Sequence, residues 1–206
     1  MKVLITGRLP DAVLADVETA HEVVCNRDDH PLSREQLLSQ IEGKDGLLCM
    51  ITDTVDTELL QRAPGLKIIA NYGVGFNNID VDAASDRGIP VTNTPGVLTA
   101  ATADITLALI LAAGRRVVEG DRRTREGRFQ FWAPFHFLGS EINGKTLGII
   151  GMGRIGKAVA KRAAGFDMDI LYTGRRRLPA SIESSYKATC TDLNTLLARS
   201  DFISLH

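Results

Sequence analysis

Short apolar runs rich in β-branched residues alternate with segments of helical spacing along the first hundred residues. The strand-like runs read KVLIT, HEVVC, GLLCMI and LKIIAN, and helical segments such as PDAVLADVETA and SREQLLSQIE lie between them. Parallel strands need long crossover connections, usually helices, and helices on both sides leave such strands apolar on both faces. The alternation therefore predicts an α/β fold built on a parallel sheet.

The same alternation returns in the second half of the chain after an interruption. Residues from Thr99 to about Arg128 have helical spacing, apolar at first and then strongly charged, as in a helix that leaves one domain to contact another domain or a second chain. The aromatic segment FQFWAPFHFLGSEING follows, and we interpret it as an irregular loop covered in a subunit contact. The runs KTLGIIG, MDILYTG and DFISLH then predict a second parallel sheet of three strands. An open edge is a liability that complete proteins avoid, so we expect the chain to be the first part of something longer.

The composition favours no charged polymer as a partner. The 206 residues are 44% apolar, enough for a buried core, and 24 basic against 25 acidic residues leave a net charge of −1. We therefore expect neither nucleic acid nor a membrane as a partner, and a cytoplasmic location by default, because no signal-peptide pattern is present. Cys25, Cys49 and Cys190 lack metal-ligand spacing, so we interpret them as reduced, buried thiols and predict no metal site.

One glycine motif carries the main functional signal. The segment LGIIGMGRIGKAVA has Gly151, Gly153 and Gly156 in G-x-G-x-x-G spacing, after a strand pattern and before a helical one. Such glycines allow a tight turn, close approach of the backbone to a pyrophosphate, and packing of helix on strand. We predict a dinucleotide site here; the alternative is a purely structural turn.

Three arginines follow the next strand, in ILYTGRRRLPA. An acidic residue at the end of this strand would bind the ribose of NAD and repel a 2′-phosphate. Gly174 occupies that position, and Arg175, Arg176 and Arg177 follow it with guanidinium groups suited to phosphate. We therefore predict that NADP(H) is preferred and NAD(H) is possible. The alternative is a solvated basic turn.

A second candidate for anion binding is the strand end NYGVGFNNIDV. Gly73 and Gly75 flank Val74, and consecutive backbone amides in such a turn form a nest for an anion such as a small carboxylate. The segment is equally typical of an ordinary strand-to-helix turn with Asp80 as the N-cap. The residues alone favour neither interpretation.

Taken together, these segments resemble the D-isomer-specific 2-hydroxyacid dehydrogenase family. The resemblance runs from about Leu59 onward and rests on NYGVGFNNID, VTNTPGVLTAATAD, FWAPFHFLG, GKTLGIIGMGRIGKAVAKRAAGFDMDILY and SDFISLH. Within the family it is closest to the glyoxylate/hydroxypyruvate reductases. It implies a flavodoxin-like substrate domain in residues 1–98 and, in residues 99–206, the first part of a Rossmann-type coenzyme domain that is incomplete at residue 206.

The resemblance also implies roles for particular residues. Val74 and Gly75 resemble the family's clamp for the substrate carboxylate. The cofactor-binding positions are Thr102, Gly151, Gly153, Arg154, Ile155, Gly156, Gly174, Arg175, Arg176, Arg177 and His206. The catalytic arginine, glutamate and histidine belong to motifs beyond the SDFISLH strand, so none is expected in this chain, and His136 is expected to pack in the aromatic loop. Ala100 departs from the acid that the family often has there, which is expected to alter only a helix cap. A homodimer through residues 99–140 is also implied.

The resulting functional hypothesis is an oxidoreductase that transfers a hydride from NADPH to a small 2-oxo acid, such as glyoxylate or hydroxypyruvate, to give the D-2-hydroxy acid. One alternative within the family is D-3-phosphoglycerate dehydrogenase activity, although the Val74 segment has no basic residue near it for a substrate phosphate. Another is a non-catalytic, dinucleotide-sensing protein like the corepressors that share the family fold. The 206-residue chain by itself is expected to be inactive.

Overall fold

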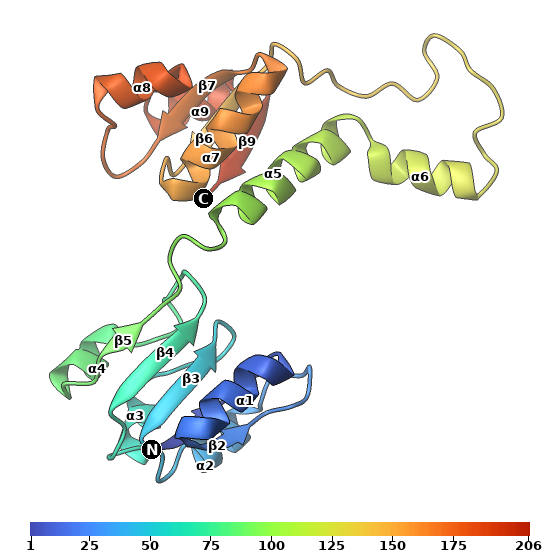
Figure 1. Ribbon diagram of the computed structural model, residues 1–206. Helices are drawn as coiled ribbons and strands as arrows, with labels where there is room; N and C mark the ends of the chain where they lie inside the picture. Colours follow the sequence, from blue (N-terminus) through green and yellow to red (C-terminus); the bar gives the residue numbers. More distant parts are fainter. The chain divides into compact units, whose positions relative to one another are not determined.

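Two parallel sheets organise the chain in the computed structural model, which describes all of residues 1–206 (Figure 1). One sheet belongs to a unit of residues Met1–Gly96 and the other to a unit of residues Val97–His206. Every strand pair in both sheets is parallel, which confirms the predicted α/β class. The predicted domain boundary lies after residue 98, and the assignment of a substrate role and a coenzyme role to the two units stays a prediction.

The first unit alternates strands and helices, and its strands lie in the order β2-β1-β3-β4-β5. This order places β1, β3 and β4 in the interior of the sheet. Because the strands are parallel, the loops that follow them lie at the same edge of the sheet. The elements are β1 (Lys2–Ile5), α1 (Asp11–Ala20), β2 (Glu22–Cys25), α2 (Arg34–Gln40), β3 (Gly46–Met50), α3 (Thr57–Arg62), β4 (Ile68–Tyr72), α4 (Val81–Asp86) and β5 (Val91–Thr92).

Both faces of the first sheet are buried. The adjacent residues Leu4 and Ile5 of β1 point to opposite faces, and both are fully buried. Leu4 belongs to a core with residues of α2, α3 and α4, whereas Ile5 packs with Leu14 of α1. The apolar strand pattern that predicted a parallel sheet thus reflects helices on both sides.

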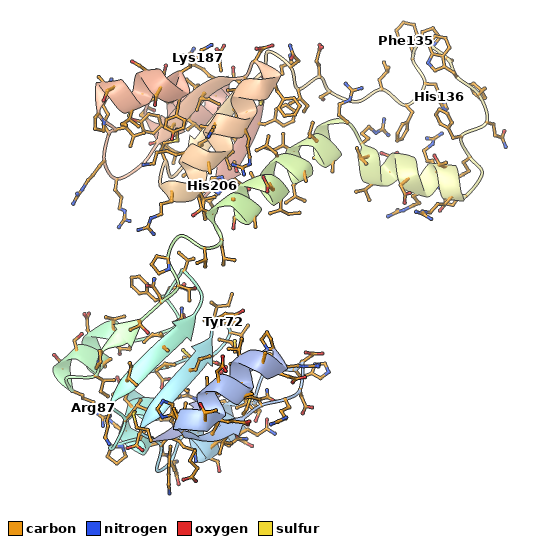
Figure 2. All side chains as sticks on the ribbon, viewed as in Figure 1. Tyr72, Arg87, Phe135, His136, Lys187 and His206 are labelled. Atoms are coloured by element: carbon orange, nitrogen blue, oxygen red, sulfur yellow. The ribbon has the colours of Figure 1, made fainter.

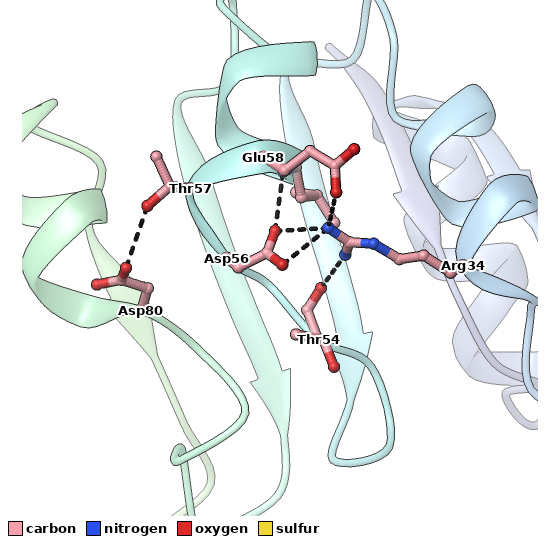
Figure 3. A network of polar contacts seen from close by, with 7 residues as sticks. Arg34, Thr54, Asp56, Thr57, Glu58 and Asp80 are labelled. Atoms are coloured by element: carbon pink, nitrogen blue, oxygen red, sulfur yellow. Dashed lines mark hydrogen bonds and ion pairs between the residues drawn. The ribbon is translucent and has the colours of Figure 1, made fainter.

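An ion-pair network fastens α2 to the start of α3 (Figure 3). Arg34 donates to both carboxylate oxygens of Asp56 at 2.6 and 2.8 Å, to Glu58 at 2.8 Å and to the Thr54 carbonyl at 2.8 Å. Asp56 is also the N-cap of α3, because its Oδ1 accepts the Leu59 N–H at 3.0 Å. Burial alone would raise the pKa of Asp56, but these hydrogen bonds and the charge of Arg34 outweigh it and hold that pKa below its ordinary value.

The second unit has a sheet of four strands in the order β8-β7-β6-β9. Its elements are α5 (Thr99–Gly114), α6 (Val117–Arg125), β6 (Thr146–Ile150), α7 (Arg154–Ala163), the 3₁₀ turn η1 (Ala164–Phe166), β7 (Asp169–Thr173), α8 (Ala180–Tyr186), β8 (Ala188–Cys190), α9 (Leu193–Arg199) and β9 (Phe202–Leu205). The prediction of three strands was wrong, because it missed α8 and β8. β8 has only three residues, too few to show an apolar period.

Helices cover both faces of the second sheet as well. Leu147 and Ile149 of β6 belong to a core with residues of α5 and α7. The intervening residue, Gly148, faces α9 so closely that a Cβ on it would collide with Ser200 and Leu196. The central strands of this sheet are therefore covered on both faces.

The predicted continuous helix from Thr99 to about Arg128 is interrupted. Arg116 adopts a left-handed conformation with φ of 56° between α5 and α6. Its guanidinium group donates to Glu119 at 2.7 and 2.8 Å and to the Leu138 carbonyl at 3.0 Å, and it lies 4.2 Å from the centre of the Phe137 ring. These contacts, two of which come from distant residues, offset the cost of the left-handed backbone.

The cysteines are all free, but only Cys49 is buried. Cys25 and Cys190 are half-buried, so the expectation of three buried thiols was wrong for these two. Burial raises the pKa of the Cys49 thiol to about 12. None of the helices is both long and apolar enough to cross a membrane.

We expect Asp56→Asn to lower the free energy of unfolding at pH 7 by roughly 0.5–1 kcal/mol, a figure already reduced for the partial exposure of this side chain. The pKa of Asp56 is lowered in the folded protein, so its contribution is present above the unfolded pKa of about 3.9 and is lost as pH falls through the folded value. Urea denaturation followed by circular dichroism should show a difference between wild type and variant at pH 7 that closes in acid.

The matched control is Asp80→Asn. Asp80 caps α4 through the Ala83 N–H at 2.9 Å but has no arginine partner (Figure 3). An equal loss for both variants would contradict a stabilising role for the Arg34 ion pair.

Candidate functional site

The turn after β6 requires glycine at two of its three motif positions. Gly151 has a φ of 101°, and a Cβ there would collide with the His206 carbonyl oxygen. A Cβ on Gly156 would collide with the Gly151 carbonyl oxygen, so this glycine lets α7 pack directly on the turn. Gly153 is different, because a Cβ there would meet no atom within 4 Å. The fold therefore explains Gly151 and Gly156, whereas Gly153 leaves open space at the start of α7.

The N-terminus of α7 is suited to an anion. Gly153 is its N-cap and supplies no side-chain hydrogen bond to the first turn. Arg154 and Ile155 are the first two helical residues, and their N–H groups lack partners within the chain. Free N–H groups and the helix dipole together favour a negative charge at this end.

A pocket of about 710 Å³ lies beside this helix start. Its walls come from the ends of β6, β7 and β9 and from the loop after β7. The lining residues are Ile150, Gly151, Met152, Gly153, Gly174, Arg175, Arg176, Leu178 and His206. The structure thus brings together Gly151, Gly153, Gly174, Arg175, Arg176 and His206 from the predicted set, whereas Thr102, Arg154, Ile155, Gly156 and Arg177 do not line the pocket.

Gly174 follows β7 directly and leaves the pocket without an acidic side chain at that point. A Cβ on Gly174 would meet only the Met152 backbone nitrogen, at 3.9 Å, so the position has room for a side chain. Arg175 and Arg176 are exposed and form no ion pair or side-chain hydrogen bond within the chain. Two uncompensated positive charges therefore border the pocket.

Arg177 lies elsewhere, contrary to its predicted place among the phosphate-binding arginines. Its guanidinium group forms a fork on Glu183, with Nε to Oε1 and Nη2 to Oε2 distances of 3.0 Å each. Glu183 also accepts the hydroxyl of the fully buried Tyr172 at 2.7 Å. The bond with Arg177, and then that with Tyr172, holds the pKa of Glu183 below its usual value.

Tyr172 links this pair to the pocket wall. Its hydroxyl oxygen accepts the N–H of Leu178 at 2.8 Å, and Leu178 lines the pocket. Burial, assisted by the neighbouring Glu183, raises the pKa of Tyr172 to about 12. Sequence reasoning missed both Tyr172 and Glu183; the available signal was a single acidic residue in the helix that follows three arginines.

His206 directly follows β9 and lines the pocket. Its backbone N–H donates to the Ile150 carbonyl at 2.9 Å, and Nε2 of its imidazole lies 2.8 Å from the Ser204 hydroxyl. Burial lowers the pKa of the imidazole, which favours the neutral form. These contacts orient the ring at the edge of the pocket.

Thr102 is half-buried in the first turn of α5, and its N–H donates to the Leu98 carbonyl at 2.9 Å. Leu98 is the N-cap of α5 and provides no side-chain cap. Ala100, in the first turn, also provides no side-chain cap. Asp104, one turn further along α5, pairs with Arg162 of α7 at 2.6 Å. The structure therefore places Thr102 on the helix that packs against α7.

In the first unit, the segment after β4 forms a loop with free amides. The N–H groups of Val74 and Gly75 have no partner within the chain, whereas their carbonyl oxygens are held. Asn93 donates to the Val74 carbonyl at 2.8 Å, and the buried Asn71 donates to the Gly75 carbonyl at 2.6 Å. Asp80 caps α4, so both interpretations of this segment describe part of it.

Sequence reasoning missed the asparagines that hold this loop. Asn93 fixes the Val74 carbonyl, which belongs to the peptide that carries the Gly75 N–H, and Asn71 fixes the next carbonyl, that of Gly75. The Gly73 carbonyl, in the peptide that carries the Val74 N–H, accepts the Thr94 N–H at 3.0 Å. The signal was present as asparagines inside strand-like segments, where their strand propensity is poor. We infer that they are there for the loop and not for the sheet.

The aromatic loop between α6 and β6 is irregular and exposes large apolar side chains (Figure 2). Phe131, Trp132 and Phe135 are 61%, 79% and 89% exposed. His136 packs on Phe131 with ring centres 4.8 Å apart. An apolar surface of this kind is typical of an interface.

Comparison with known proteins shows which family the sequence matches. The family model described as D-isomer specific 2-hydroxyacid dehydrogenase, catalytic domain, matches residues 3–198. Glyoxylate reductase from Thermococcus litoralis is 49% identical over 209 residues, which cover 100% of this chain and 63% of the relative. The chain therefore spans less than two thirds of the length of this relative.

Solved structures of known proteins share the fold. The TT0316 protein from Thermus thermophilus has a TM-score of 0.90 at 46% identity, over 100% of this chain and 64% of that one. D-Lactate dehydrogenase from Aquifex aeolicus, complexed with NAD and lactic acid, has a TM-score of 0.83 at 26% identity, covering 100% and 60%. An acyclic imino acid reductase in complex with NADPH and D-Arg has a TM-score of 0.84 at 27% identity, covering 100% and 65%.

We expect alanine substitutions at Gly156 and Gly153 to have very different effects on the free energy of unfolding. Gly156→Ala should lower the free energy of unfolding by about 1–3 kcal/mol, because its Cβ forces α7 away from the turn. Gly153→Ala should change it by less than about 0.5 kcal/mol, because the position is open. Chemical denaturation of the two variants checks this, and equal losses would show that the packing at Gly156 is not the constraint.

Proposed function

Because the chain belongs to the D-isomer specific 2-hydroxyacid dehydrogenase family, we propose that the whole protein is an NADPH-preferring reductase of a small 2-oxo acid such as glyoxylate or hydroxypyruvate. Its product is the D-2-hydroxy acid. The observation that carries this proposal is the pocket in which Gly174, Arg175 and Arg176 adjoin the glycine turn.

The residues of the pocket fit a dinucleotide. Gly153 leaves open space where a backbone must approach a pyrophosphate, and the free N–H groups at the start of α7 face the same region. In the proposal, the turn and the residues Arg154 and Ile155 hold the pyrophosphate, and Arg175 and Arg176 hold the adenosine 2′-phosphate. Thr102 and His206 flank the nicotinamide end. The bound cofactor would supply a hydride.

The lack of an acid at Gly174 supports the preference for NADP(H). A carboxylate there would accept the ribose hydroxyls of NAD and repel a 2′-phosphate. Instead, two unpaired guanidinium groups border the pocket. Since each charge-assisted hydrogen bond contributes roughly 1.5–3 kcal/mol, one good contact is enough for a preference of about tenfold to a hundredfold. NAD(H) remains a usable cofactor in this scheme.

The substrate carboxylate is assigned to the Val74 and Gly75 amides. Both N–H groups are free. Asn93 holds the peptide that carries the Gly75 N–H, and the Thr94 N–H holds the peptide that carries the Val74 N–H. The hydride goes to the carbonyl carbon and a proton to its oxygen. We assign no catalytic acid to residues 1–206; the family's arginine, glutamate and histidine are proposed to lie in the length that the relatives have beyond this match.

A homodimer through residues 99–140 is the proposed assembly. Its support is the exposed apolar surface of the aromatic loop and of α5, where Ile105 and Leu109 are 56% and 62% exposed. Two-fold pairing would cover these side chains. Size-exclusion chromatography with light scattering tests it directly.

We expect the full-length protein to reduce glyoxylate with a higher kcat/KM for NADPH than for NADH. Gly174→Asp should lower the NADPH/NADH ratio at least about tenfold, because it places a carboxylate where the 2′-phosphate is proposed to bind. Steady-state kinetics with both cofactors measure the ratio.

The matched control is Gly165→Asp, which adds the same charge at an exposed glycine with no neighbour within 4 Å. An unchanged NADPH/NADH ratio of kcat/KM in Gly174→Asp would indicate that the arginines form only a solvated turn. Dinucleotide binding without turnover of any 2-oxo acid would instead favour a sensor.

We expect Asn93→Ala to raise the KM for glyoxylate about fivefold, the equivalent of one neutral hydrogen bond, while the KM for NADPH stays constant. The substitution releases the Val74 carbonyl and lets the peptide that carries the Gly75 N–H turn away. Asn26→Ala is the control, because Asn26 holds the Thr6 and His30 carbonyls of another loop at 3.0 and 2.9 Å. A parallel rise in both KM values would indicate a general loss of structure.

A further inference from the structure

Glu183 is the only acidic residue between Gly174 and Tyr186, the segment that includes the proposed phosphate-binding loop, and its side chain is 12% exposed. Through the Tyr172 hydroxyl it is linked to Leu178, which lines the pocket. Since Tyr172 is fully buried, its hydrogen bond to Glu183 also keeps the Glu183 carboxylate from turning out to solvent.

Arg177 is the one arginine of the cluster that is not available to a ligand. Both of its bonds go to the two oxygens of Glu183, in a bidentate fork. Arg175 and Arg176, in contrast, line the pocket without partners in the chain. The three neighbouring arginines thus have two different environments.

We propose that Arg177 strengthens the cofactor preference by neutralising Glu183, and that, of the three arginines, only Arg175 and Arg176 contact the 2′-phosphate. This inference rests on the proposed NADPH preference. It makes Arg177 a positioning residue whose effect passes entirely through one carboxylate.

The physical reason is the position of Glu183, which Tyr172 holds beside the loop that lines the pocket. Without Arg177, the unpaired negative charge of Glu183 would repel a phosphate dianion in the adjoining pocket. With Arg177 in place, the pair presents nearly zero net charge, and the positive charge of the other two arginines dominates the pocket. Removing both members of the pair should therefore have little effect, whereas removing only Arg177 should weaken phosphate binding.

A double-mutant cycle on the full-length protein tests this. The primary measurement is the dissociation constant of 2′-AMP by calorimetry, which needs no turnover, and the NADPH/NADH ratio of kcat/KM accompanies it. Arg177→Leu should weaken 2′-AMP about fivefold. Glu183→Gln, which keeps a hydrogen-bond acceptor for Tyr172, should leave binding unchanged or tighten it. The double variant should return to within about twofold of wild type.

Three controls fix the interpretation. Arg176→Leu should weaken 2′-AMP in both the wild-type and the Glu183→Gln background, as a direct contact would. Binding of 5′-AMP should stay constant throughout. Arg62→Leu, which removes an exposed ion pair with Glu42 in the other unit, should change neither constant.

Two results would overturn the inference in distinguishable ways. If the double variant binds 2′-AMP as weakly as Arg177→Leu does, then Arg177 contacts the phosphate directly or shapes the loop by itself. If the wild-type protein binds 2′-AMP no more tightly than 5′-AMP, the proposed NADPH preference fails, and the inference that rests on it fails as well.

Discussion

At Gly151 the backbones of three neighbouring strands come together with no room for a side chain. The Gly151 N–H donates to the Thr173 carbonyl and the His206 N–H to the Ile150 carbonyl, each at 2.9 Å, so the end of β6 is held from both sides. Gly156 then sets α7 against the same turn. Gly174 follows β7, His206 follows β9 and Gly153 begins α7, so the pocket is a consequence of where three adjacent parallel strands end.

The charges around this pocket are arranged locally, although the whole chain is nearly neutral. Arg175 and Arg176 stay free, while Glu183, the one acidic residue between Gly174 and Tyr186, is paired with Arg177 and bonded to the buried Tyr172. A run of three arginines is thus not one uniform patch. Two of its members are available to a ligand, and the third is paired with Glu183.

Much of this arrangement could be predicted from the sequence, because it follows from strand periodicity and from backbone sterics. The alternating apolar runs indicated parallel sheets, and the glycine spacing indicated the turn. β8 was missed because three residues show no period, and the break at Arg116 because it depends on Phe137 and Leu138, which are distant in sequence. The position of Arg177 depends on where Glu183 lies on a helix that was not predicted, and no local pattern encodes that contact.

The two candidate anion sites use the same backbone device with different surroundings. Each offers free N–H groups, at Val74 and Gly75 in one unit and at the start of α7 in the other. Asparagines hold the first loop, and no arginine or lysine bonds to it, so it gains fixed geometry without net charge. Such a loop suits a single carboxylate better than a phosphate dianion, whereas the pocket with two free arginines suits the dianion. This contrast supports the proposal that the substrate is a small, unphosphorylated 2-oxo acid and that the phosphate bound in the pocket is that of the cofactor.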